Sequence, residues 1–69
     1  MNKWKIDIIL NSGKELTVYY KGYEDSSGKV ADKILVGNLN AINGFGNENG
    51  TQNIFVRIGE IAVAAISIV

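Results

Sequence analysis

Few side chains of this chain could do chemistry, because it contains neither cysteine nor histidine. That composition excludes a disulfide framework, a zinc site built on these residues and any catalysis that depends on them. The acidic residues are scattered and form no D-x-D-x-D loop for a hard cation. Asp7 and Glu15 fall on one predicted hairpin, but nothing in the pattern joins them into a catalytic dyad. We therefore expect a protein that is not an enzyme and that has no metal and no cofactor.

The segment NGFGNENGTQN (43–53) is the clearest candidate for ligand binding. Its glycines miss the G-x-G-x-x-G phosphate-binding spacing by one position, and the segment follows a predicted helix instead of preceding one. Its polar backbone and amide side chains could still hydrogen-bond a small polar ligand, with Phe45 stacked on a ring. The alternative is that the Asn-Gly pairs only mark turns and that Phe45 folds onto the core.

The tyrosines are the next candidates. Strand alternation places Tyr20 on the core side and Tyr19 on the opposite face, with Tyr23 beyond the end of the strand. Exposed tyrosine is typical of binding surfaces, whereas the alternative is a ring that covers a small core with its hydroxyl in water.

Arg57 is the only arginine of the chain. Its guanidinium could bind a phosphate or a partner carboxylate through two hydrogen bonds. The alternative is an ion pair with Glu60 or with Asp7 on a neighbouring strand. The candidate ligand-binding residues are thus Phe45, Asn47, Thr51, Asn53, Arg57, Tyr19 and Tyr23.

Two strands of the N-terminal half must position these residues. Residues 3–10 and 15–22 alternate between apolar and polar side chains, which predicts half-buried strands, and NSGK (11–14) predicts the four-residue loop of an antiparallel hairpin. The predicted core-facing residues are Trp4, Ile6, Ile8 and Leu10 on the first strand, with Leu16, Val18 and Tyr20 on the second.

A helix should follow, capped by Ser26 or Ser27 and running from about residue 28 to 38–42. Its apolar stripe would be Val30, Ala31, Ile34, Leu35, Leu39 and Ile42. Gly37 weakens its second half. If KILVGN (33–38) is instead a short strand, the fold becomes an all-β barrel.

The C-terminal residues 53–69 predict a second hairpin with a type II′ turn at Gly59 and Glu60. In that register Ile58 pairs with Ile61, Val56 with Val63 and Ile54 with Ala65, all facing the core. The alternative is a bulge at Gly59 within one long strand.

The last strand would be apolar on both faces, which is typical of a strand buried on both sides. One helix covers only one face of the sheet, so a second copy of the chain should cover the other. The predicted oligomer interface is Ala62, Ala64, Ile66 and Ile68.

These elements predict a single α+β domain over residues 1–69, with a four-stranded antiparallel sheet in the order ββαββ and one helix on one face. A small all-β barrel of the SH3/Sm type is the alternative. Lys plus Arg equals Asp plus Glu, so a nucleic-acid partner is not expected. The most apolar run, 61–69, is shorter than the ~20 residues of a membrane-spanning helix. We expect a cytoplasmic protein.

The stretches WKIDIILNSGKELTVYYKG, GFGN and IFVRIGEIA together resemble small uncharacterised proteins encoded by phages and prophages of Gram-positive bacteria. The resemblance covers most of the chain and implies a viral accessory role, acting by binding, in the host cytoplasm. Some small phage oligomers sequester the cyclic nucleotide signals of host defence. The resemblance thus implies a homo-oligomer that captures a small nucleotide-type ligand or a host protein.

Two alternatives to this anti-defence function remain open. The chain could be a structural or assembly component of a virion, or a small nucleic-acid-binding domain. Neutral charge weighs against the last of these.

Overall fold

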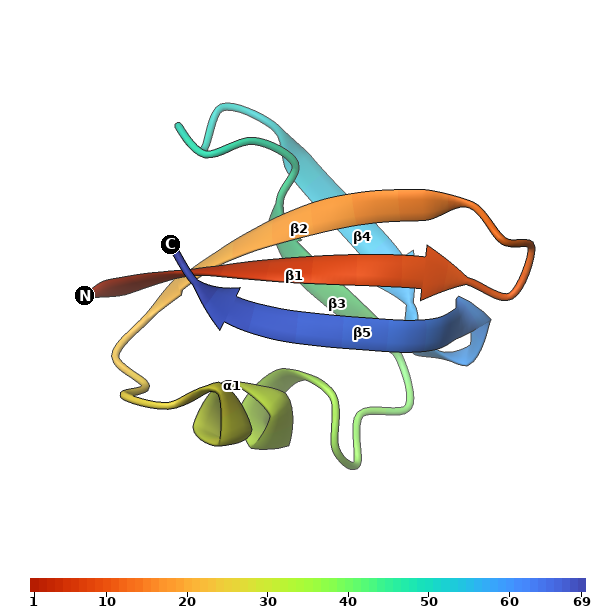
Figure 1. Cartoon of the computed structure of the whole chain (residues 1–69), viewed down its shortest axis with the longest axis horizontal. Coiled ribbons are helices and arrows are strands. Elements are labelled where there is room, and N and C mark those ends of the chain that lie inside the picture. The colour runs from red at the N-terminus through yellow and green to blue at the C-terminus, as the bar shows by residue number, and fades with distance from the viewer.

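The computed structural model describes all residues, 1–69, as one antiparallel sheet with one helix (Figure 1). The elements in chain order are β1 (Asn2–Leu10), β2 (Glu15–Gly22), α1 (Ser27–Ile34), β3 (Ala41–Phe45), β4 (Asn53–Arg57), the single 3-10 turn η1 (Ile58–Glu60) and β5 (Ile61–Ile68). The sheet order is β4-β3-β2-β1-β5. β3 and β4 cross behind β1, β2 and β5, so the bent sheet forms two layers. The predicted combination of sheet and single helix is confirmed, but the predicted count of four strands is wrong because there are five.

The N-terminal hairpin forms as the alternation predicts. Trp4 lies opposite Tyr20, Ile6 opposite Val18 and Ile8 opposite Leu16, so one face of both strands points inward. Because opposite partners in an antiparallel pair share a face, the odd-numbered residues of β1 and β2 all point outward.

The core lies between the two layers. Its buried cluster is Ile6, Ile8, Val18, Ile42 and Val56, and these residues come from both layers. Burying each such side chain contributes roughly 1.5–3 kcal/mol. Trp4 and Val30 are also buried, so α1 contributes to the interior through Val30.

The helix begins where predicted and ends earlier. Ser26 is the N-cap, and its hydroxyl accepts a hydrogen bond from the Lys29 N–H. Gly37 has a φ of 75°, a left-handed conformation that stops a helix and that glycine adopts without strain. The side-chain amide of Asn38 then donates to the carbonyls of Ile34 and Ala41, which links the end of α1 to the start of β3.

The predicted continuation of the helix to residues 38–42 is therefore wrong. Leu39 is exposed, and Ile42 is buried as part of β3 instead of lying on a helical stripe. The segment 43–53 is correspondingly not a connection between helix and hairpin. It comprises the end of β3, the loop 46–52 and the first residue of β4, so it forms a hairpin of its own.

The predicted C-terminal hairpin is also wrong, because β4 pairs with β3 and β5 pairs with β1. Residues 58–60 form the 3-10 turn, which redirects the chain to the opposite edge of the sheet. The backbone N–H of Asn11 donates to the Glu60 carbonyl at 2.8 Å, and its side chain donates to the Gly59 carbonyl at 3.0 Å. These bonds fix the turn against the β1–β2 loop, so neither a II′ turn nor a bulge in one long strand forms at Gly59.

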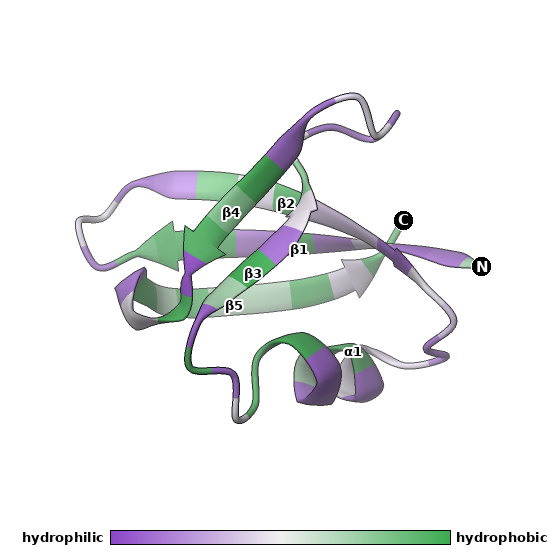
Figure 2. Ribbon diagram, turned by 180° about the vertical axis from the view of Figure 1, so that it is seen from behind, coloured by the Kyte–Doolittle hydropathy of each residue, from purple (hydrophilic) through white to green (hydrophobic).

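From Val63 onward the two faces of β5 are the reverse of those predicted, whereas Ile61 lies on the core side as predicted. Ile66 lies opposite Ile6, and Ala64 lies opposite Ile8, so both pack against the core, while Val63 and Ala65 point outward. The register shifts between Ile9 and Leu10, which places Ile61 on the core side as well. β5 carries no charged residue and shows no hydrophilic colour in its central part (Figure 2).

Candidate functional site

One row of outward side chains crosses all five strands of the sheet. Each member lies opposite the next in the strand register, so all share one face. From β5 to β4 the row is Ser67, Lys5, Tyr19, Phe45 and Asn53. The row contains a cation, two aromatic rings and two hydrogen-bonding ends, and these are groups that recognise ligands.

A pocket of about 220 Å³ lies on this row between β2, β3 and β4. Its outward-pointing side chains are Tyr19, Lys21, Asn43, Phe45 and Asn53. The Lys21 ammonium lies 5.6 Å from the centroid of the Phe45 ring, within the range of a cation–π interaction.

Gly44 makes this pocket possible because it lets β3 cross close to β2. A Cβ at this position would lie 2.5 Å from Cγ1 of Val18 and 2.7 Å from the carbonyl oxygen of Tyr19. No larger residue fits without moving one of the two strands. The close approach brings Phe45 opposite Tyr19, the register pair that joins β2 to β3.

Three of the residues predicted for ligand binding, Tyr19, Phe45 and Asn53, therefore meet in one place. Asn47 and Thr51 instead hold the neighbouring loop together. The Asn47 side chain donates to Oγ1 of Thr51 at 2.9 Å, and its Oδ1 accepts from the Thr51 N–H at 3.0 Å. The loop lies against the pocket, because a Cβ on Gly50 would be 3.6 Å from Nζ of Lys21.

Tyr23 and Arg57 lie apart from this pocket. Tyr23 is exposed in the connection after β2, and Arg57 is at the far end of β4. Arg57 borders a second depression, of about 320 Å³, that is otherwise mainly apolar. It forms no ion pair, so the alternative of a pairing with Glu60 or Asp7 is wrong.

Lysines are the site residues that the sequence analysis missed. Lys3 and Lys21 lie directly opposite each other on the outward face, and Lys5 lies opposite Tyr19. Neither Lys3 nor Lys21 forms an ion pair, and the ammonium of Lys5 is 3.8 Å from a carboxylate oxygen of Asp7. The alternation of β1 and β2 and the length of the loop between them already imply that Lys3 faces Lys21. A net charge of zero does not reveal this pair.

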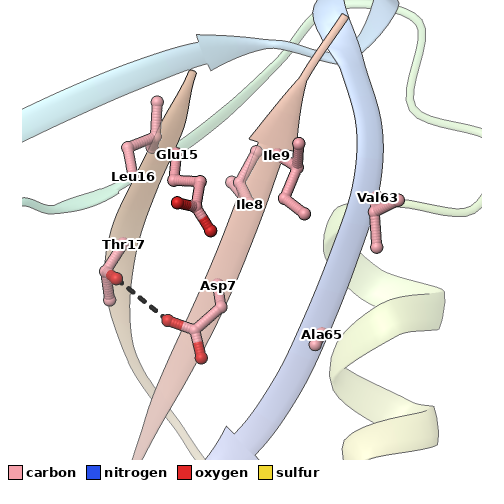
Figure 3. A pocket seen from close by; sticks show the side chains of 8 residues that line it. All are labelled: Asp7, Ile8, Ile9, Glu15, Leu16, Thr17, Val63 and Ala65. Atoms are coloured by element: carbon pink, nitrogen blue, oxygen red, sulfur yellow. Dashed lines mark hydrogen bonds between the residues drawn. The ribbon is translucent and has the colours of Figure 1, made fainter. Parts of the chain in front are cut away.

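The other end of the same face is acidic and aliphatic. Asp7 and Glu15 border an open depression of about 490 Å³ together with Ile9, Val63 and Ala65 (Figure 3). The Thr17 hydroxyl donates to Asp7 at 2.9 Å. No group of three metal-ligating side chains is present in the structure. The outward face therefore has a basic–aromatic end, defined by Lys3, Lys5, Tyr19, Lys21 and Phe45, and an acidic end.

A polar cluster supports the basic–aromatic end from the inner side of the sheet. The Tyr20 hydroxyl donates to Oε1 of Glu24 at 2.7 Å, and Nζ of Lys33 lies 3.7 Å from the same oxygen. Burial, together with the nearby Glu24 carboxylate, raises the pKa of Tyr20 to about 12. The hydrogen bond from Tyr20 lowers the pKa of Glu24. A Cβ on Gly22 would collide with the side chains of Glu24 and Tyr20, so a larger residue there would displace this cluster.

No protein-family model, no curated protein and no solved structure matches this chain. The structure contains no helix long and apolar enough to cross a membrane. A function must therefore be argued from the geometry of the two ends of the sheet.

Proposed function

We propose that this chain is a non-enzymatic binding protein whose pocket at the basic–aromatic end takes a small ligand of nucleotide type, with a ring and a negative charge. The observation that carries the proposal is the placement of Lys21 over the Phe45 ring, beside Tyr19 and two asparagine side chains. Lys21 has no acidic partner, so its ammonium is available to a phosphate.

The rest of the pocket suits a heterocyclic ring. Tyr19 and Phe45 are half-buried, so each ring is held by its surroundings while part of its surface stays accessible. Asn43 and Asn53 are exposed, and their amides can both donate and accept hydrogen bonds. A volume of about 220 Å³ suits one ring system better than a large ligand.

We also propose that the fold is an open variant of the small SH3/Sm-type barrel, which was the alternative fold from the sequence. Five short antiparallel strands bent into two layers support it, with α1 inserted between β2 and β3. In such a barrel the binding face is the outside of the curved sheet, where the basic–aromatic end lies.

The proposal also includes self-association through β5. This strand is an edge of the sheet, it has no charged residue, and Val63 and Ile68 on it are exposed. Uncharged apolar edges invite pairing with another chain. Of the predicted interface residues, Ala64 and Ile66 are used by the core, so the contact would involve the strand edge with Ala62 and Ile68. A phage accessory role of the anti-defence type agrees with both the ligand pocket and the self-association. A virion component needs only the self-association.

A thermal-shift experiment with a panel of mononucleotides and cyclic nucleotides tests the pocket. A ligand at a hundred times its Kd should add about 2.7 kcal/mol to the free energy of unfolding. For a domain of this size that raises the Tm by roughly 10 °C or more. Phe45→Leu and Lys21→Gln should each abolish most of the shift.

Matched controls keep this result specific. Phe55→Leu and Lys14→Gln change the same residue types at exposed positions outside the pocket, and they should leave the shift unchanged. If no nucleotide raises the Tm, the ligand proposal is wrong and the virion role becomes the better one.

A further inference from the structure

The geometry points to a single-stranded nucleic acid as the ligand of the basic–aromatic end, running across the strands along the row from Asn53 to Ser67. This inference rests on the proposed pocket and names the class of molecule that uses it. The row extends well beyond the pocket, through Lys5 to Ser67 on the far edge strand.

The first support is an electrostatic arrangement that costs stability. Lys3 and Lys21 lie directly opposite each other, and like charges at such positions destabilise a sheet. No carboxylate forms an ion pair with either of them. A fold gains nothing from this pair by itself, whereas a polyanion lying over both ammonium groups removes the repulsion.

The second support is length. Neighbouring strands are about 4.8 Å apart, so four steps between five strands span roughly 19 Å. Stacked nucleotides advance about 3.4 Å along one strand. The row is therefore long enough for several nucleotides, while a mononucleotide would occupy only the pocket between β2 and β4.

The third support is that two adjacent rings of the row are flanked by lysines. Tyr19 and Phe45 offer adjacent surfaces on which bases can stack, and Lys3, Lys5 and Lys21 flank them on β1 and β2. Stacking platforms combined with a basic track are the usual means of binding single strands without sequence preference. Phosphate contacts alone would also attract duplexes, but the rings require unpaired bases.

The neutral net charge of the chain does not oppose this ligand, because Lys3 and Lys21 have no acidic partner and only Lys5 lies near a carboxylate, 3.8 Å from Asp7. Asp7 and Glu15 lie at the other end of the outward face, where they would repel a phosphate backbone. Glu48, the acid of the neighbouring loop, is exposed. The unpaired charges of Lys3 and Lys21 therefore favour a bound strand at this end of the face.

Fluorescence anisotropy with a labelled thymidine octanucleotide, competed by thymidine monophosphate, tests the inference on the full chain. The octanucleotide should bind at least 10-fold more tightly than the mononucleotide. Neutralising three phosphates should give a slope of about −2 in the logarithm of affinity against the logarithm of salt concentration. Lys5→Gln and Lys3→Gln should weaken octanucleotide binding about 3- to 10-fold and weaken mononucleotide binding clearly less, because neither lysine lines the pocket.

Lys14→Gln, in the exposed loop at the other end of β2, is the matched control and should bind like the unmodified chain. Equal affinity for the two ligands, or no effect of Lys5→Gln, overturns the inference while the proposed pocket stands. Failure of the octanucleotide, the mononucleotide and the nucleotide panel to bind overturns both. Unchanged melting temperatures of the lysine variants establish that a loss of binding is not a loss of folding.

Discussion

The two ends of the outward sheet face are built on the same strands and differ in how their charges are arranged. At the acidic end Asp7 accepts a hydrogen bond from Thr17 and lies near Lys5, so its charge is compensated within the protein. At the basic–aromatic end Lys3 faces Lys21 without a carboxylate between them. The fold thus supplies partners for Asp7 at one end, whereas Lys3 and Lys21 at the other end have none and remain available to a ligand.

The largest effect is expected from breaking the geometry of the basic–aromatic end at Gly44. Gly44→Ala places a methyl group against Val18 and the Tyr19 backbone, so it should lower the free energy of unfolding by about 2 kcal/mol, in the range of overpacked sites. Chemical denaturation measures this change. Gly59→Ala is the control, since a Cβ there meets nothing within 4 Å, and its effect should be small. Equal effects of the two changes would contradict the close crossing of β2 and β3.

Part of the basic–aromatic end could be predicted from the sequence and part could not. The β1–β2 hairpin was predicted correctly because strict alternation fixes which side chains point inward, and a short loop fixes which residues are opposite. The same information implies that Lys3 faces Lys21, a pair that the net charge does not reveal. Tyr19, Phe45 and Asn53 were predicted one by one, but their meeting depends on the crossing at Gly44, which local pattern does not encode.

The second half of the chain was harder for a physical reason. β5 is apolar on both faces, so its pattern does not say which face is the core, and its register shift near Ile61 adds a further change of phase. Gly59 favours a local hairpin between β4 and β5. Pairing of β5 with the distant strand β1 instead packs Ala64 and Ile66 against the core. Long-range pairing decided the outcome.

A smaller effect should come from the polar cluster that supports the basic–aromatic end. Because the folded pKa of Glu24 is lowered, its contribution to stability is present above the ordinary glutamate pKa of about 4.3 and is lost as pH falls through the folded pKa. Glu24→Gln should therefore reduce the acid-induced fall in Tm. Melting curves between pH 7 and pH 3 measure it.

The control for this pH dependence is Glu48→Gln, in the exposed hairpin loop, where the acid limb should keep its shape. If Glu24→Gln and the unmodified chain lose stability in parallel as the pH falls, the Tyr20–Glu24 hydrogen bond does not contribute as described.

The smallest effect sharpens the comparison most, because stability and binding should move in opposite directions. Lys3→Glu replaces a pair of like charges with a pair of opposite charges across β1 and β2, and should stabilise the fold by about 0.2–1 kcal/mol. The same change should weaken octanucleotide binding. Denaturation and anisotropy on one preparation check both. A loss of stability, or unchanged binding, would contradict the claim that Lys3 is placed for a ligand.

The most direct test of the whole account is a map of backbone amide chemical shifts during titration of the protein with the thymidine octanucleotide. We expect the perturbed amides to gather along the basic–aromatic end, at residues 3, 5, 19, 21, 45, 53 and 67. Amides at the acidic end, at residues 7, 9, 15 and 63, should not move. No perturbation, or one centred on the acidic end, would contradict the account.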